Sequence, residues 1–301
     1  MSFSEYIKAV ATGSKGNYEL TPFQAEDVIT KILTQTFTQS QIGAYLASWR
    51  ARYETDNELK VAFNTLTKFV RPQNSLPQSI ELGYPYDGKS KNSFLYALAA
   101  KEVLKDGIEL IISSDKTLEP KRGISALELN EKVSFSSNIH LLDRANFLPE
   151  LTSLTTIRNE LTVRTVFNTI EKLTNPCGSK YAIIGLHHKP YVEKYKKILN
   201  TRYERLLIVQ GDEGSPEMSK SGSIWILEAD KLTEQYIDFD KLGIKSVHRK
   251  TKMGIKEMED IIKSPNKEYQ AVAKLNAALL LIASKKFDAI NQALSHLQVS
   301  Q

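Results

Sequence analysis

The sequence has very little cysteine and no long hydrophobic run, and both shortages limit what the protein can be. Cys177 is the single cysteine among 301 residues, which excludes an internal disulfide and suits a reducing cytoplasm. No stretch of eighteen consecutive apolar residues occurs, and the most apolar run, Leu279–Ala283, is far too short to span a bilayer. The N-terminus lacks a basic segment followed by an apolar core, so no signal peptide is predicted. We therefore expect a cytoplasmic protein with no membrane partner.

The sequence also lacks a large excess of positive or of negative charge. Lysine and arginine number 40 and aspartate and glutamate 35, which gives a net charge of +5. This mild excess is compatible with phosphate-bearing partners without proving them. Hydrophobic residues make up 41% and charged residues 25%, which is ordinary for a globular protein. The length allows a small domain plus a larger one.

The first seventy residues indicate a small helical unit. Three capping boxes, in which a threonine is followed three residues later by Gln or Glu, begin at Thr21, Thr38 and Thr55. The segment Arg71–Pro77 is rich in proline and polar residues, as linkers are. We therefore divide the chain into a helical domain at residues 1–72 and a larger domain at residues 73–301.

Beyond residue 80, patterns typical of strands and of helices alternate along the chain. This alternation predicts a parallel or mixed sheet with crossover helices. The expected fold class is therefore α/β, with a small N-terminal helical domain and a large domain built on a mixed central sheet. The clearest expected strands are Ile108–Ile112, Tyr181–Gly185 and Leu206–Val209, and the clearest helices are Ser93–Lys105 and Lys267–Ser284.

The segment Ile157–Tyr191 carries the most specific motifs, among them TVFN at Thr165–Asn168 and TNP at Thr174–Pro176. With these motifs the chain resembles the anthranilate phosphoribosyltransferase family, glycosyltransferase family 3, over nearly its whole length. The resemblance implies the nucleoside phosphorylase and phosphoribosyltransferase type of fold, and a homodimer formed through the helical domain. In enzymes of the family it also implies Mg²⁺, phosphoribosyl pyrophosphate and anthranilate.

Enzymes of this family bind phosphoribosyl pyrophosphate with a GTGGD loop whose amides close on the phosphates. The matching place here reads ELGYPYDGKSKN, in which Pro85 removes an amide donor and two tyrosines add bulk. The usual phosphate cradle is therefore expected to be spoiled. If the protein is an enzyme, the resemblance implies the ligand-binding residues Gly83, Asp87, Gly88, Arg158 and Asn168.

The metal-binding position of the family has changed as well. An adjacent Asp-Glu pair supplies oxygen ligands for Mg²⁺ in the enzymes, whereas this chain has Pro216 followed by Glu217. Glu217 remains a weak metal candidate, and Asp212 and Glu213 lie near enough in sequence to substitute. The adjacent pair His187-His188 points to opposite sides of an extended segment, which favours a structural or groove-lining role.

At the positions where the chain does not match the motifs of the enzymes, it is similar to a divergent, nucleic-acid-binding branch of the family. The agreements are PYDGK, PKRG, RTVFNTIEKLTNP and GLHHKPY. Basic residues interleaved with aromatics are typical of grooves that bind single strands. The residues expected to rim such a groove are Lys89, Lys91, Lys116, Lys121, Arg122, Arg158 and Arg164.

Two main functions are therefore open at the level of sequence. The first is a non-catalytic homodimer that binds single-stranded DNA or RNA, with weak sequence specificity, steep salt dependence and no cofactor. The alternative is a Mg²⁺-dependent phosphoribosyltransferase acting on phosphoribosyl pyrophosphate and anthranilate or a related nitrogen acceptor. A structural dimer with an unrelated small ligand is a third alternative.

Overall fold

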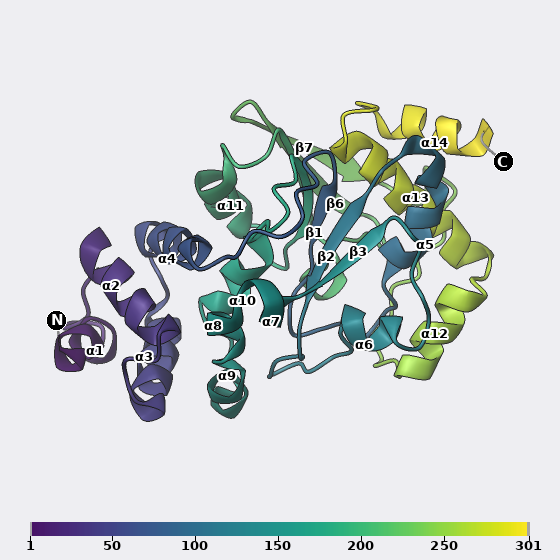
Figure 1. The fold of residues 1–301 in the computed structure, drawn as a ribbon. Coiled ribbons are helices and arrows are strands. Elements are labelled where there is room, and N and C mark those ends of the chain that lie inside the picture. Colours follow the sequence, from purple (N-terminus) through teal and green to yellow (C-terminus); the bar gives the residue numbers. More distant parts are fainter. Residues whose placement is uncertain (1, 300–301) are drawn as a thin grey trace.

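Four helices form the N-terminal unit of the computed structural model, which describes residues 2–299 (Figure 1). The three sequence-predicted capping boxes are confirmed, because Thr21, Thr38 and Thr55 each accept a hydrogen bond from the third amide of the helix that follows. Buried Glu58 joins two of the helices by accepting from the Trp49 indole at 3.1 Å and from the Arg52 guanidinium. The helices are α1 (Phe3–Ala11), α2 (Pro22–Leu33), α3 (Gln39–Arg52) and α4 (Asp56–Lys68).

A seven-stranded mixed sheet forms the centre of the larger unit, with the order β3-β2-β1-β4-β5-β6-β7. The strands from β3 to β5 run parallel, and β6 and β7 add an antiparallel edge. The expected mixed sheet is thus confirmed. The strands are β1 (Ile80–Gly83), β2 (Leu110–Ser114), β3 (Ile139–Asp143), β4 (Tyr181–Gly185), β5 (Arg205–Val209), β6 (Gly222–Glu228) and β7 (Lys231–Ile237).

Helices cover both faces of this sheet and also fill the space between it and the N-terminal unit (Figure 1). They are α5 (Leu95–Glu102), α6 (Ala126–Asn130), α7 (Arg144–Phe147), α8 (Pro149–Thr152), α9 (Thr155–Leu161), α10 (Phe167–Ile170), α11 (Tyr191–Leu199), α12 (Ile255–Lys263), α13 (Lys267–Ala283) and α14 (Ile290–Val299). Single-turn helices are η1 (Leu104–Asp106), η2 (Glu171–Leu173) and η3 (Asp212–Gly214). Within the described range 2–299, no helix is both long enough and apolar enough to cross a membrane.

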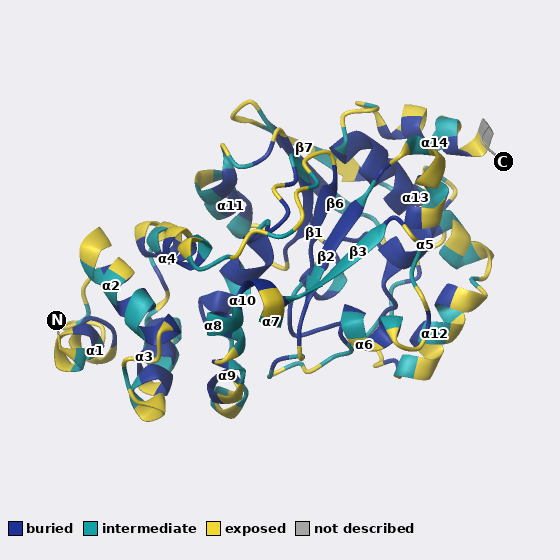
Figure 2. Ribbon diagram, viewed as in Figure 1, coloured by how far each residue is buried: buried dark blue, intermediate teal, exposed yellow. Residues whose placement is uncertain are grey.

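Two hydrophobic cores lie on opposite faces of the sheet (Figure 2). Successive residues of a strand point to opposite faces, so Ile183 of β4 joins the core under α5 and α13, whereas Ile184 joins the other core. That second core continues into the N-terminal helices, where it includes Trp49 of α3. The segment between α4 and β1 that holds the expected boundary at residues 72 and 73 contains no helix or strand.

Candidate functional site

The order of the parallel strands places a crevice beyond the carboxyl ends of β1 and β4. Chain connections leave these two neighbouring strands in opposite directions along the sheet, and ligands of open α/β sheets bind at such a reversal. Three loops meet there, at residues 84–94 after β1, 186–190 after β4 and 210–221 after β5. Most of the sequence-predicted site residues lie in or beside these loops.

Backbone amides of the loop after β1 donate hydrogen bonds to carbonyl groups of the protein itself. Gly88 donates to the Pro85 carbonyl at 3.2 Å, and Lys89 donates to the Ile124 carbonyl at 3.0 Å. Gly88 has a φ of +72°, and a Cβ there would lie 2.8 Å from the backbone of Gly123, so the two loops pack backbone against backbone. Because these amides already have protein acceptors, this part of the loop does not form an open cradle for a pyrophosphate.

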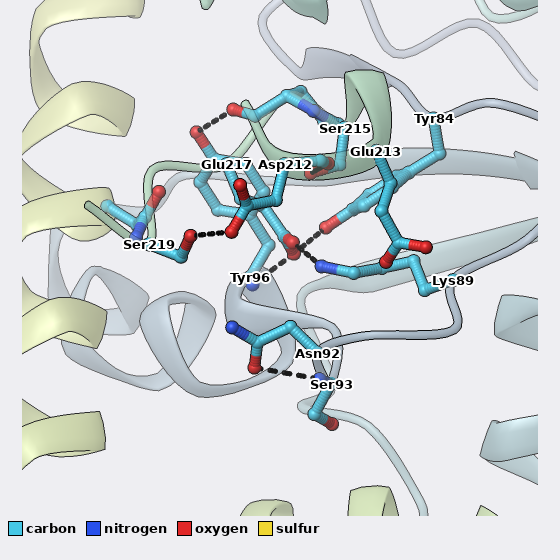
Figure 3. Close-up of polar contacts among 12 residues, drawn as sticks. Tyr84, Lys89, Asn92, Ser93, Tyr96, Asp212, Glu213, Ser215, Glu217 and Ser219 are labelled. Atoms are coloured by element: carbon cyan, nitrogen blue, oxygen red, sulfur yellow. Dashed lines mark hydrogen bonds and ion pairs between the residues drawn. The ribbon is translucent and has the colours of Figure 1, made fainter. Parts of the chain in front are cut away.

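The Lys89 side chain crosses the loop and ends beside Glu217 (Figure 3). Both side chains are almost fully buried, with 2% and 1% of their surface exposed. The Glu217 carboxylate also accepts from the Tyr84 hydroxyl and from the Tyr96 backbone amide at 3.1 Å. A buried carboxylate requires a compensating charge and hydrogen bonds, and here Lys89 supplies that charge from within the chain.

The Glu213 carboxylate likewise accepts hydrogen bonds from the loop after β1. It accepts from Ser90 through both the backbone amide at 3.0 Å and the hydroxyl at 2.6 Å, and from the Lys91 amide at 3.0 Å. The Lys121 ammonium lies 2.9 Å away. Burial opposes ionisation of Glu213, but the Ser90 bonds and the Lys121 pair outweigh it and lower its pKa.

Asp212 has a comparable set of partners. It accepts from the Ser219 hydroxyl, lies 2.7 Å from His248 Nδ1 and 3.3 Å from the Lys220 ammonium. Burial raises its pKa, and these bonds and charges outweigh that effect, so its pKa falls below the usual value.

The three carboxylates named from the sequence as metal candidates therefore do not fit Mg²⁺ in this arrangement. Mg²⁺ is held by carboxylate oxygens that remain accessible to its waters and to substrate phosphates. Glu217, Asp212 and Glu213 are each paired instead with a cationic side chain of the protein. Over residues 2–299, no group of three or more metal-ligating side chains gathers in one place.

Arg158 also forms an ion pair with an acidic residue inside the protein. Its guanidinium donates two hydrogen bonds to Glu171, at 2.7 and 2.9 Å, and only 2% of its side chain is exposed. Arg144 donates to the same carboxylate and to Asp115. Glu171 belongs to the motif RTVFNTIEKLTNP, and its carboxylate supplies the counter-charge that holds Arg158.

These placements correct part of the sequence-based set. Lys89 and Arg158 were expected to rim a groove, but both are buried in ion pairs and do not present their charges to solvent. The sequence could not reveal this, because Glu217 lies 128 residues from Lys89. Lys116 and Arg122 line a separate cavity of about 770 Å³ beyond β2 and β3, together with acidic side chains such as Asp115 and Glu128.

The remaining predicted cations meet at two adjoining cavities. One, of about 130 Å³, is lined by Arg164 and Asn168, and the other, of about 400 Å³, is lined by Lys91. The cavities share His187 and Glu213. Together with Lys121, which pairs with Glu213, they define a surface that we call the basic cleft. Its cationic and histidine side chains are Arg50, Lys91, Lys121, Arg164, Lys172, His187, His188, Lys220 and His248.

Sequence reasoning missed Arg50, Lys172 and Lys220 as members of this cleft. Arg50 comes from the last turn of α3, more than a hundred residues before the loops that it meets, and no local pattern signals the encounter. Lys172 was noted only as part of a motif. The spacing of the two histidines after a buried strand was the one available signal, and both do line the cleft.

The pKa of His187 shows that these charges act on one another. Burial lowers the His187 pKa, and His188, Arg164, Lys121 and Lys220 lower it further by repulsion. The acidic side chains of the cleft pair with its cations: Asp87 binds Arg164, Glu213 binds Lys121, and Asp212 binds Lys220 and His248. The cations of the cleft therefore lie close enough to affect one another and are not scattered over separate faces.

Comparison with known proteins places this arrangement in a family. Residues 4–67 match the helical bundle domain of the glycosyl transferase family, and residues 127–300 match its a/b domain. The chain belongs to this family. That result confirms the resemblance drawn from the motifs around residues 157–191, and it confirms the expected fold class.

Individual family relatives are distant in sequence. The chain is 26% identical over 308 residues to an anthranilate phosphoribosyltransferase of Rhodopseudomonas palustris, covering 95% of this chain and 90% of that protein. It is 27% identical over 200 residues to an uncharacterized protein of Aquifex aeolicus, covering 66% of this chain and 65% of that protein.

Solved structures of the family share the fold. Anthranilate phosphoribosyltransferase from Saccharomyces cerevisiae, in complex with PRPP and Mg, superposes with a TM-score of 0.77 at 15% identity, covering 98% of this chain and 92% of that one. The enzyme from Thermus thermophilus gives 0.74 at 16% identity, with the same coverage of both chains.

Proposed function

We propose that this protein is a non-catalytic family member that binds single-stranded nucleic acid in the basic cleft. The observation that carries the proposal is the buried Lys89–Glu217 pair, which places an ammonium group where the enzymes of the family use a divalent ion and a phosphate loop. Arg158, which the resemblance assigns to ligand binding, is bound to Glu171. This second internal ion pair leaves the Arg158 guanidinium unavailable to an acceptor substrate.

The cleft has the chemistry that a single strand requires. Phosphate groups are neutralised by lysine and arginine, and bases stack on aromatic rings without strong sequence preference. Arg50, Arg164 and Lys220 supply charge at the two cavities, and Tyr191 and Tyr236 lie among their lining residues. Tyr236 is 63% exposed, which suits a stacking surface.

The alternative is a phosphoribosyltransferase that uses Mg²⁺, phosphoribosyl pyrophosphate and anthranilate or a related acceptor. It is favoured by the similarity to named anthranilate phosphoribosyltransferases over 95% of the chain. For this activity Lys89 has to leave Glu217 and Glu171 has to release Arg158. Each movement leaves a buried charge without its partner, which costs on the order of 3–5 kcal/mol.

Two parallel measurements decide between these functions. Titration of a fluorescent single-stranded DNA at two salt concentrations should give binding that weakens steeply with salt. Incubation with phosphoribosyl pyrophosphate, anthranilate and Mg²⁺ should give no turnover above a no-protein control. Absent or salt-independent binding overturns the proposal, and measurable turnover establishes the enzyme.

A homodimer formed through the N-terminal helices is part of the same proposal, as is a cytoplasmic location. Phe23 of α2 has 76% of its surface exposed, and Tyr18 just before that helix has 46%, so this unit presents large hydrophobic side chains to solvent. Cys177 is a free thiol, as expected in a reducing compartment. Light scattering after size exclusion should give twice the monomer mass, and Phe23→Glu should lower it.

A further inference from the structure

The smaller of the two cavities has a size that suits one chemical group. Its volume is about 130 Å³, whereas pockets that enclose a whole small-molecule ligand are roughly 300–1,000 Å³. It lies beside the carboxyl ends of β1 and β4, with Pro85 after one strand and Leu186 after the other in its wall. A phosphate group can enter such a space, but a sugar with its base cannot.

Cationic groups reach this cavity from four separate segments. Arg50 comes from α3, Arg164 from the loop before α10, Lys172 from η2, and the histidine pair from the loop after β4. Arg164 is shared with Asp87, but Arg50 has no carboxylate within ion-pair distance among the described residues. The Lys172 ammonium donates to the Gly185 carbonyl, which leaves further N–H groups of the same ammonium as donors.

Neutral hydrogen-bonding groups complete the wall of the cavity. Thr165, Asn168 and Thr169 line it from the start of α10. Asn168 accepts from the Thr165 amide at 2.8 Å, and this bond holds the turn that presents the three side chains. The one acidic residue in the lining set is Glu213, whose carboxylate already has Ser90, Lys91 and Lys121 as partners.

We propose that this cavity binds the terminal phosphomonoester of a nucleic-acid strand, an inference that rests on the proposed function. A phosphomonoester carries a charge of about −1.5 to −2 at neutral pH and has three free acceptor oxygens. An internal phosphodiester carries a single charge and continues into a sugar on both sides, for which the cavity has no room. The planar guanidinium group of an arginine can donate two parallel hydrogen bonds to two of these terminal oxygens.

The surroundings of the cavity also suit the first nucleotide of such a strand. Tyr191 lies in the lining set and is only half-buried, and the Lys194 ammonium lies 5.3 Å from the centre of its ring. An aromatic ring with an adjacent cation can stack a base while the cation meets the next phosphate. The strand then leaves over the larger cavity that Lys91 and Lys220 line.

The test compares the ends of otherwise identical strands. Fluorescence anisotropy is measured with a twelve-nucleotide single-stranded DNA carrying a 5′-phosphate, a 3′-phosphate or two hydroxyl ends, with the label at the opposite end. At least one phosphorylated strand should bind about tenfold tighter than the hydroxyl strand. Arg50→Ala and Lys172→Met should each abolish most of this preference, and Lys231→Ala, an exposed lysine on β7, should preserve it.

Each outcome separates this inference from the proposed function. Equal, salt-dependent binding of all three strands overturns the inference and leaves the function standing, whereas no binding of any strand removes both. Inorganic phosphate should compete more strongly against the phosphorylated strand than chloride at equal ionic strength does. If phosphate competes but the strands bind equally, the cavity takes the free anion and the strand-end inference is wrong. Arg50→Ala keeps the test valid if the buried Lys172 variant misfolds.

Discussion

Lys89 shows how the partner of a single side chain determines whether its charge is available to a ligand. Its ammonium lies beside the packed aromatic rings of Tyr84 and Phe94, 5.9 and 5.5 Å from their centres, and faces Glu217. A carboxylate that needs a positive charge obtains it from the chain, so no external cation is required for folding. In this structure the two side chains bind each other and present no free charge to solvent.

The Lys89–Glu217 pair makes a prediction for stability. Lys89→Met should lower the free energy of unfolding by about 3–5 kcal/mol, because it leaves the Glu217 carboxylate buried and uncompensated. Adding Glu217→Gln to Lys89→Met should recover most of the loss, since the remaining amide can accept from Tyr84 and Tyr96. Urea denaturation followed by circular dichroism measures both values. A loss below about 1 kcal/mol in the single variant would show that water reaches the carboxylate.

Lys172 makes a prediction for pH dependence. Burial, together with repulsion from Arg164, lowers its pKa from the usual 10.5 to about 7, so its positive charge is lost as the pH rises through 7. A bound phosphate favours the ammonium, so the preference for phosphorylated strands should fall between about pH 7 and pH 8.5. The charged and titratable groups around it are Arg164, Asp87, Glu171, Tyr195, His187 and His188.

Three features make Lys172 the main titrating group in that pH window. The phosphomonoester has its second pKa near 6, so its charge changes little above pH 7, and the His187 pKa is lowered from its ordinary value of 6.5. Burial raises the pKa of Tyr195 well above its usual range. Lys172→Met should therefore give a preference that is both small and constant over this range. A wild-type preference that does not change with pH would assign no binding role to the Lys172 charge.

At the scale of elements, capping residues and strand composition gave the most reliable predictions. The helix starts after Thr21, Thr38 and Thr55 were confirmed because a capping box is satisfied within four residues. The strand at Tyr181–Gly185 was confirmed at both ends, since Gly178 and the residues after Gly185 end the apolar run. The strand expected at Ile108–Ile112 lies two residues later, at Leu110–Ser114.

The loop after β1 shows where such prediction stops. Its composition predicted a spoiled phosphate loop and lysines that face a groove, and the structure contradicts the second expectation for Lys89. The burial of Lys89 depends on contacts with Glu217 and with Ile124, both far along the chain. Contacts between residues far apart in the sequence cannot be recognised from the spacing of neighbouring residues. Such contacts determine whether a lysine binds a ligand or another residue of the protein.

The cap of α4 supports a prediction at this scale. Thr55→Ala should lower the free energy of unfolding by about 1 kcal/mol, because the Glu58 amide loses its acceptor, now at 3.2 Å. Thr55→Ser, which keeps the hydroxyl, is the matched control and should lose only a few tenths. Tryptophan fluorescence reports the change, since Trp49 contacts Glu58 directly. Equal losses in both variants would trace the effect to the methyl group instead of the cap.

At the scale of the whole molecule, the strand order predicts where a site lies better than any motif does. The structure places most of the expected site residues beyond the carboxyl ends of β1 and β4, and it also brings α3 to that edge. The core that α3 shares with α9 and with one face of the sheet fixes this approach. Arg50 therefore meets Arg164 because of the packing of two units, which a reading along the chain cannot supply.

The combined charge of the cleft gives the last prediction. For single strands the logarithm of the binding constant falls with the logarithm of salt concentration by about 0.7 for each phosphate neutralised. Arg50→Ala together with Lys220→Ala should therefore lower that slope by about 1.4. The double variant keeps the Lys121–Glu213 pair, and Asp212 keeps its bonds to Ser219 and His248, so the cleft should retain its structure.

Titrations with an unphosphorylated strand at four salt concentrations measure this slope without any contribution from a strand end. Lys231→Ala removes the same charge from an exposed lysine on β7 and should leave the slope at the wild-type value. If the double variant and this control have equal slopes, the strand lies elsewhere on the molecule. The cavity beside Lys116 and Arg122 would then be the next surface to test, because it gathers the two exposed predicted cations that the basic cleft does not include.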